Sequence, residues 1–330
     1  MKPHALTFLV CPSCRDELTL SVTQEADGEI ETGLLTCRGC ATTYPITRGV
    51  PRFVASGEYA SSFGFQWQRF RHTQLDSQNG SGISAAALRA ATGWTAADYR
   101  GQLVLDVGVG SGRFAEVVAD AGGEVVGIDL TAAVEAAYAS IGRRPNVHIV
   151  QADVFRMPFR DGTFDRAFSI GVLHHTPDPE RAFGRMVAAV RDGGGVAIYV
   201  YARYGPSHRF SDGIRRVTTR LPLPAMLAAT TLAIPLYYVY RLPLIGGLLR
   251  IAAPISMHRD WRWRWLDTFD WYTPKYQFKY LYPEVFRWFR ANGLEDIEIF
   301  DEPIRMRGTR PRVLSAASTG TVRDTQLAAV

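Results

Sequence analysis

One short stretch constrains the fold more than any other: a buried apolar run that leads directly into three closely spaced glycines. Residues 102–107 are mainly apolar, and Gly108, Gly110 and Gly112 follow at alternate positions. An apolar run of this length is typical of a parallel strand that is covered on both faces. The glycines let the backbone approach a ligand closely, because a side chain there would collide with it. The stretch therefore predicts an α/β fold with a ligand at the end of this strand.

The spacing of the glycines indicates which kind of ligand to expect. A dinucleotide-binding fingerprint has the spacing G-x-G-x-x-G, and here Arg113 stands where the third glycine of that fingerprint would be. An acidic residue, Asp106, also precedes the first glycine by two positions. Both features favour S-adenosylmethionine over NAD, because S-adenosylmethionine carries cationic sulfonium and amino groups and has no pyrophosphate.

Further acidic residues follow the next two predicted strands. The strand at 124–129 ends in Asp129, about 20 residues after the glycines. In βαβ units, the acid that binds the ribose hydroxyls lies at the same spacing from the glycines. The strand at 146–151 leads into Asp153 and Val154. We expect the Asp153 carboxylate to accept the adenine amino group and the Val154 amide to reach a ring nitrogen. One such acid alone could be a helix cap; three at successive strand ends predict a cofactor site.

The downstream residues complete a pattern that resembles a known family. A turn at 157–165 leads to a strand at 166–170, and a fifth strand at 195–201 follows a helix and a glycine turn. From Leu103 to Tyr201 the chain resembles class I methyltransferases related to the ubiquinone and menaquinone C-methyltransferases. The resemblance implies a Rossmann-like sheet with helices on both faces. The implied cofactor contacts are Asp106, Gly108, Gly110, Gly112, Asp129, Leu130, Asp153, Val154, Ser169 and Gly171.

Two adjacent histidines, His174 and His175, follow the fourth strand at the edge where ligands bind in open α/β folds. Histidine titrates near neutral pH, so either is a candidate general base for an acceptor that must lose a proton. The alternative is that one or both cap the following turn or line the cofactor pocket. Nothing in the sequence favours one histidine over the other.

All four cysteines of the chain lie within its first forty residues, in two C-x-x-C pairs. Each pair, Cys11 with Cys14 and Cys37 with Cys40, predicts a tight knuckle with both thiolates facing one point. Two such knuckles complete a tetrahedral four-sulfur shell of the kind that structural zinc prefers. Two disulfides or a redox dithiol are the alternatives. A four-thiolate shell leaves no open position, so we expect the zinc to stabilise a segment too small to fold alone.

The residues around these cysteines also carry a resemblance. The run from Cys37 to Ile46 and the later Gly49-Val-Pro-Arg-Phe resemble the zinc ribbons of the tRNA-methyltransferase activator family over about residues 8–55. Members of that family occur as partners of methyltransferases or fused ahead of them. The resemblance therefore implies a small zinc ribbon joined to the catalytic domain.

The chain divides into six predicted segments. The linker contains an unusually aromatic run, in which Tyr59 and Trp67 are candidates for a lid over the cofactor; a helix packed on the core is the alternative. The final part of the core is expected to supply a helix at 282–293 and two strands. The segments are 1–55 (zinc ribbon), 56–100 (aromatic linker or lid helices), 101–205 (cofactor half of the methyltransferase core), 206–270 (apolar and aromatic insert), 271–317 (rest of the core) and 318–330 (mobile tail).

The insert is the least regular part of the sequence. Residues 221–240 carry no charge, but three prolines interrupt them, and a single crossing of a membrane would separate the last strands from their sheet. We expect a helical cap that walls an apolar acceptor pocket or makes peripheral membrane contact through 221–265. The alternative is a pair of helices packed internally on the core.

Charge and composition narrow the function. The net charge of +5 is spread without a basic stripe, so a nucleic-acid partner is not expected. No signal peptide is apparent at the N-terminus, so we expect a cytoplasmic protein, with the inner face of the membrane as a further option. Three functions remain open: a methyltransferase for a small-molecule or lipid-like acceptor, an RNA methyltransferase whose zinc module recognises RNA, and a non-catalytic scaffold that binds the cofactor.

Overall fold

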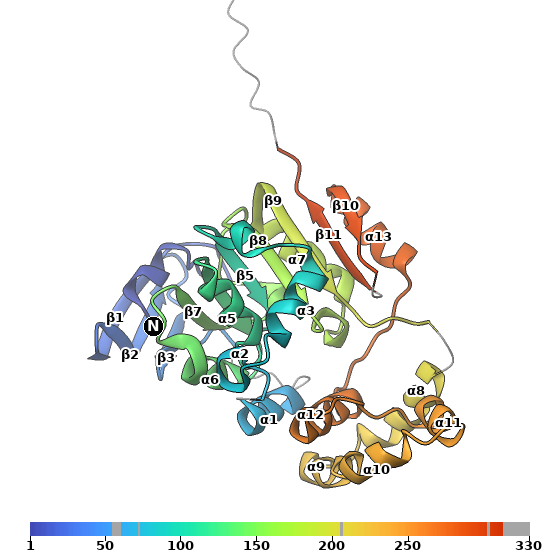
Figure 1. The fold of residues 1–330 in the computed structure, drawn as a ribbon. Helices are drawn as coiled ribbons and strands as arrows, with labels where there is room; N and C mark the ends of the chain where they lie inside the picture. The colour runs from blue at the N-terminus through green and yellow to red at the C-terminus, as the bar shows by residue number, and fades with distance from the viewer. Residues whose placement is uncertain (55–60, 72, 205–206, 302–303, 313–330) are drawn as a thin grey trace, which may run out of the picture.

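The computed structural model describes residues 1–54, 61–71, 73–204, 207–301 and 304–312. The chain forms two sheets and a group of helices (Figure 1). The N-terminal residues form a small sheet beside a large central sheet, and a group of helices lies at one end of the molecule. Tyr59 and the tail at 318–330, for which the sequence suggested a lid and a mobile end, lie outside the described residues.

The central sheet has seven strands in the order β10-β11-β9-β8-β5-β6-β7. The neighbours among β5 to β9 pair in parallel, and β11 pairs antiparallel with both β9 and β10. The carboxyl ends of β5, β6 and β8 therefore meet at one edge, on both sides of the point where the strand order reverses. The strands are β5 (Leu103–Val107), β6 (Glu124–Asp129), β7 (Val147–Gln151), β8 (Phe164–Ile170), β9 (Val190–Tyr199), β10 (Glu295–Ile299) and β11 (Arg305–Thr309).

Both faces of this sheet are buried, as the apolar strands predicted. Along β5, Leu105 and Val107 belong to one core cluster and Val104 belongs to the other, because successive side chains point to opposite faces. Helices α7 (Pro179–Ala189) and α13 (Tyr282–Ala291) pack in the first cluster. The second holds α3 (Ile83–Thr92), α5 (Arg113–Asp120) and α6 (Ala133–Ala137). The predicted Rossmann-like fold class is confirmed.

One strand differs from its predicted bounds. The expectation was a glycine turn followed by a strand at 195–201, whereas β9 begins earlier, at Val190, and runs through the glycines. The register between β8 and β9 shifts next to Phe164. A Cβ atom on Gly194 would lie 2.6 Å from the Asp165 carbonyl oxygen, so the glycine allows the backbones to approach there. The turn signal in this case marks an irregular strand.

The N-terminal segment forms a four-stranded antiparallel ribbon that is docked on the β7 edge of the central sheet. A parallel bridge joins Arg52 to Gln151, and the Phe53 amide donates a hydrogen bond to the Gln151 carbonyl over 2.8 Å. The core of the ribbon is continuous with one face of the central sheet. The ribbon thereby covers what would be an exposed edge strand. Its elements are the 3-10 helix η1 (Pro3–Thr7), β1 (Leu18–Ala26), β2 (Glu29–Cys37), β3 (Thr43–Thr47) and β4 (Val50–Pro51).

Polar contacts reinforce this docking. Lys2 Nζ donates to the carbonyls of Gly142 and Val147 over 2.7 and 3.0 Å. The Tyr138 hydroxyl donates to the Glu29 carboxylate over 2.6 Å. These groups connect the ribbon to residues more than one hundred positions away, so the two parts pack as one unit.

The insert is a layer of short helices beside the central sheet (Figure 1). It has small apolar clusters of its own, one of which includes Phe65 of α1 (Ser61–Phe70), and α12 packs against that helix. Among the described residues, no helix is both long and apolar enough to cross a membrane. The helices are α8 (Ser207–Thr218), α9 (Leu223–Thr230), α10 (Ala233–Val239), α11 (Ile245–Ala252) and α12 (Trp261–Tyr272).

Candidate functional site

A cavity of about 430 Å³ opens at the carboxyl ends of β5, β6 and β8. The glycine loop after β5 and the ends of the strands form its floor, and α1 and α12 contribute the facing wall. This volume lies within the range of small-molecule sites. The sequence-predicted residues that line it are Gly108, Gly110, Asp129, Leu130, Val154, Gly171 and His175.

The other predicted residues do not line the described cavity. The Asp153 carboxylate accepts the Phe155 amide over 3.0 Å and so caps the short helix η4 (Val154–Arg156). The Ser169 hydroxyl donates to the Val107 carbonyl over 2.9 Å. Gly112 has a φ of 96°, and a Cβ there would lie 2.7 Å from Ile141. The remaining two, Asp106 and His174, are buried.

Asp129 fixes the shape of the cavity floor. One carboxylate oxygen accepts the Gly110 amide over 3.2 Å, and the other accepts the amide and hydroxyl of Thr131 over 2.9 and 2.8 Å. Gly108 and Gly110 both have positive φ, 87° and 54°, which glycine adopts without strain. The carboxylate therefore ties the glycine loop to the end of β6 while it remains at the cavity wall.

Asp129, which lines the cavity, and its buried neighbour Asp106 make this floor receptive to a cation. Burial raises the pKa of Asp106 well above its ordinary value, and the neighbouring charge of Asp129 raises it further. Burial also raises the pKa of Asp129, although its hydrogen bonds oppose the shift. A positive ligand relieves both effects, because it favours the ionised carboxylates.

Several buried polar atoms at this site lack a partner among the described residues. They are Gln66 Oε1, Asp106 Oδ2, Ser111 Oγ and His175 Nε2, and all but Asp106 belong to residues that line the cavity. Buried polar groups in folded proteins are usually hydrogen-bonded, so their clustering at one cavity indicates a polar ligand. Together with the glycine loop and the two acids, the oxygens of Gln66 and Ser111 suit the ribose, amino and sulfonium groups of S-adenosylmethionine.

The two histidines have different environments in the structure. His175 Nδ1 lies 2.8 Å from the Tyr276 carbonyl, which can only accept, so Nδ1 carries the proton and Nε2 is the basic nitrogen. Burial lowers the pKa of His175 to about 3, so the ring is neutral at pH 7. His174 is fully buried with its ring 3.9 Å from that of Tyr201, and burial lowers its pKa well below the ordinary value. Only His175 lines the cavity.

The facing wall contains two acids that the sequence analysis did not assign to the site. Asp267 and Asp270 lie one turn apart on α12 and line the cavity. Gln66 and Tyr201 donate to Asp270 over 3.1 and 3.3 Å, and the Ser256 hydroxyl donates to Asp267 over 3.0 Å. Burial raises the pKa of Asp267 to about 7 and the pKa of Asp270 to about 6. The acidic pair at i and i+3 in an aromatic run was the available signal.

The aromatic linker also reaches the cavity. Phe63 and Trp67 of α1 line it, and a Cβ on Gly110 would lie 3.0 Å from the Trp67 indole. Helix α1 also packs against α6 and α12. The two interpretations of this segment, a lid and a packed helix, thus apply to the same element.

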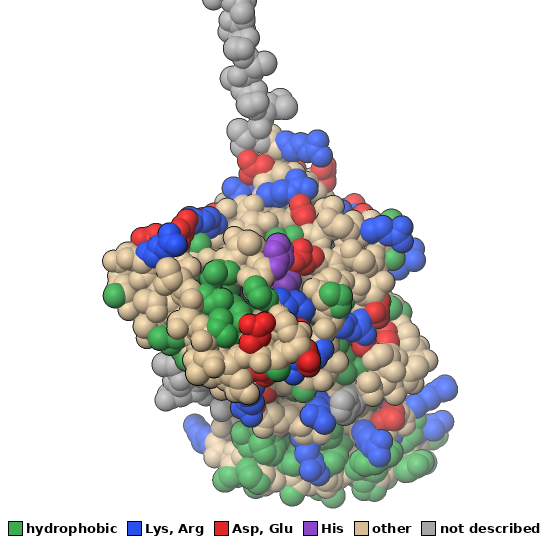
Figure 2. Space-filling view, turned by 90° about the vertical axis from the view of Figure 1, so that its left-hand side faces the viewer, with side chains coloured by type: hydrophobic (Ala, Val, Ile, Leu, Met, Phe, Trp, Pro, Cys, Tyr) green, Lys and Arg blue, Asp and Glu red, His purple; other side chains and the backbone are tan. Residues whose placement is uncertain are grey.

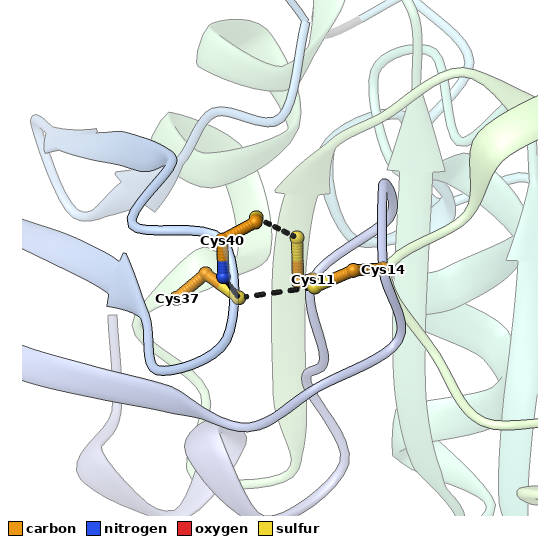
Figure 3. Close-up of side chains that lie close together, drawn as sticks. All are labelled: Cys11, Cys14, Cys37 and Cys40. Atoms are coloured by element: carbon orange, nitrogen blue, oxygen red, sulfur yellow. Dashed lines mark hydrogen bonds between the residues drawn. The ribbon is translucent and has the colours of Figure 1, made fainter.

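The four cysteines come together in the N-terminal ribbon. Their sulfur atoms all lie within 4.8 Å of one another, with Cys11 and Cys40 3.7 Å apart and Cys14 and Cys37 3.3 Å apart (Figure 3). A tetrahedral zinc site with Zn–S bonds of about 2.3 Å requires sulfurs about 3.8 Å apart, so the cluster fits a structural zinc ion. All four thiols are free of disulfide bonds.

Two segments of the chain match models of known protein families. Residues 105–198 match the family model described as a methyltransferase domain, and residues 2–49 match the model described as Trm112p-like protein. Both matches fall on the segments for which the sequence suggested these families.

Three relatives each match about a third of this chain. Phosphoethanolamine N-methyltransferase 2 of Caenorhabditis elegans is 39% identical over 112 residues, which cover 32% of this chain and 25% of the relative. Demethylmenaquinone methyltransferase of Renibacterium salmoninarum is 33% identical over 32% of this chain and 45% of its own length. Probable tRNA methyltransferase 9B of Mus musculus is 33% identical over 33% and 24%. The matches thus span from about a quarter to under half of the relatives' length. This chain therefore joins a Trm112p-like domain at residues 2–49 to a methyltransferase domain at residues 105–198.

Proposed function

We propose that this protein is an S-adenosylmethionine-dependent methyltransferase for a small-molecule or lipid-like acceptor. The observation that carries the proposal is the cavity itself, whose floor is the glycine loop with Asp129 and whose facing wall comes from α1 and α12. The floor suits the cofactor. Trp263, Leu266 and Trp271 of α12 add apolar surface on which an acceptor can pack.

When bound, S-adenosylmethionine supplies a methyl group that is already activated on a positively charged sulfur. The protein then has to align the acceptor and exclude water. Asp129 and the glycine loop hold the adenosyl end, and the aromatic residues of α1 and α12 close the cavity over it. His175 Nε2 takes the proton of an acceptor that must lose one, because this nitrogen is unprotonated and lies in a residue of the wall.

The ribbon supports a second part of the proposal. We infer that Cys11, Cys14, Cys37 and Cys40 hold one zinc ion in a closed four-sulfur shell. Such a shell has no open position for a substrate, so the ion acts by stabilising the ribbon and, through it, the β7 edge of the catalytic sheet.

A second candidate acceptor is RNA, favoured by the Trm112p-like domain and by the relative named as a probable tRNA methyltransferase. Calorimetry with S-adenosylmethionine, followed by transfer of isotopically labelled methyl groups to lipid extracts, small-molecule extracts and RNA, tests both candidates. We expect heat of binding and label in an organic-soluble or small-molecule product. Label in RNA would exclude the first acceptor class, and the absence of binding heat would exclude the activity.

Replacing His175 tests its assignment as the base. For an acceptor that loses a proton, we expect His175→Gln to lower turnover roughly 10²-fold with little change in cofactor affinity. This is the lower end of general-base effects, because a pKa of about 3 makes Nε2 a weak base. Burial lowers the pKa of His175 to about 3, so its imidazole stays neutral between pH 8 and pH 5. Protonation of His175 should therefore cause no loss of wild-type turnover in this pH range.

His174→Gln is the matched control, since His174 does not line the cavity. We expect this variant to keep most of its turnover once thermal unfolding has confirmed that it is folded. Equal turnover in wild type and His175→Gln would rule out a base at this position.

A further inference from the structure

The outer side of the insert exposes apolar side chains that its own small clusters do not use. Leu244 is 89% exposed, Leu248 is 71% exposed and Tyr238 is 70% exposed. Figure 2 shows apolar side chains gathered at the end of the molecule that the insert forms, with basic side chains beside them. We call this surface the insert face and define it by Val217, Leu232, Tyr238, Leu244, Ile245 and Leu248.

Apolar patches of this kind mark sites of contact with a partner or a membrane. The insert face spans residues from the end of α8 to α11. The apolar residues that pack inward are different ones, including Ala233, Tyr240 and Ile255. The exposed residues are therefore available to an external partner.

The charge around the insert face indicates what that partner is. Residues 213–259 contain six arginines and no aspartate or glutamate. The whole chain has a net charge of +5 and this segment one of +6, so all other residues together carry −1. Five of the six arginines are exposed: Arg216, Arg220, Arg241, Arg250 and Arg259. The excess positive charge of the protein is thus concentrated beside its exposed apolar surface, and the even spread of charge expected in the sequence analysis is wrong for this segment.

We propose that the insert face docks on the surface of an anionic membrane. Leucines enter the boundary between headgroups and acyl chains, and arginines reach the lipid phosphates with their stems along the apolar layer. Tyr238, and Trp261 at the start of α12, have the amphipathic rings that settle at such a boundary. The short helices α9 to α11 suit a surface attachment.

Helix α12 connects the insert face to the cavity. The Trp265 indole donates to the Leu227 carbonyl of α9 over 3.0 Å, and Arg264 donates to the Ile234 carbonyl of α10 over 3.3 Å. The same helix lines the cavity with Trp263, Leu266, Asp267, Asp270 and Trp271. Docking would place the acceptor wall next to the lipid layer, which agrees with the proposed lipid-like acceptor, while the docking itself does not depend on that activity.

Flotation with lipid vesicles tests the docking. We expect the full-length protein to float with vesicles of phosphatidylcholine and phosphatidylglycerol, to bind pure phosphatidylcholine at least tenfold more weakly, and to lose affinity as salt increases. The double variant Leu244→Glu/Leu248→Glu should lose at least tenfold in affinity for the anionic vesicles. Both side chains are exposed, so the variant should unfold at the same temperature as the wild type.

Ile299→Glu is the matched control, because Ile299 is 53% exposed on β10, outside the insert face. It should float like the wild type. The proposal is overturned if the full-length protein floats with neither vesicle, or if the double glutamate variant floats as well as the wild type. A different result would point to another role. If the wild type does not float but forms dimers in the absence of vesicles, and the double variant is monomeric, the insert face joins two copies of the chain.

Discussion

Asp129→Asn is expected to weaken S-adenosylmethionine binding at least roughly a hundredfold. Two hydrogen bonds from the ribose hydroxyls to this charged acceptor would contribute about 1.5–3 kcal/mol each. The wild-type carboxylate lies at the cavity wall and accepts the Gly110 amide, so the substitution removes the charge that faces the ligand and loosens the glycine loop. Calorimetric titration of the folded variant measures the loss directly.

Asp153→Asn supplies the comparison for this prediction. Asp153 follows the neighbouring strand, and the sequence pattern assigns it to adenine, but in the structure its carboxylate caps η4 and does not line the cavity. We therefore expect the Asp153→Asn protein to bind the cofactor with an affinity only a few fold different from that of the wild type. Equal losses in the two variants would show that the cofactor site extends beyond this cavity.

Cys37→Ser is expected to release the metal and to lower the midpoint of thermal unfolding by roughly 10 °C. Loss of a structural zinc site costs several kcal/mol of stability, and each kcal/mol lowers the midpoint by about 2 °C in a chain of this size. Cys37 is buried at the end of β2, where its sulfur lies 3.3 Å from that of Cys14. Metal analysis by atomic emission and calorimetric melting measure the two effects.

Ser13→Ala is the control for the cysteine variant, because Ser13 lies exposed in the same knuckle and is not one of the four cysteines. It should retain one equivalent of zinc and the wild-type melting temperature. If the purified protein contains no metal and its denatured chain has no free thiols, the disulfide alternative is correct and the zinc assignment is wrong.

The parts of the site that the sequence could predict are those that a local pattern fixes. The glycines and Asp129 follow strands that are recognisable from their apolar runs, and the carboxyl ends of parallel strands meet at one edge of a sheet. No distant contact had to be known for that inference. The cysteine cluster was accessible for the same reason, since the spacing within each C-x-x-C pair defines its knuckle.

The remaining parts depend on contacts between distant segments. Asp270 reaches the cavity because α12 packs on α1, and its hydrogen bond with Gln66 joins residues 204 positions apart. The choice between His174 and His175 rests on the Tyr276 carbonyl, about one hundred residues later. Helical periodicity describes which residues share a face of α12, but it contains no information on what that face meets.

The covalent attachment of the ribbon to the sheet whose edge it covers has a consequence for assembly. Two separate chains would associate in proportion to their abundance, whereas a tethered module meets its target at an effective concentration on the order of millimolar. The two halves are also made in equal numbers by every round of translation. Specific activity should therefore stay constant on dilution to nanomolar protein, and an excess of free ribbon should not compete for the edge.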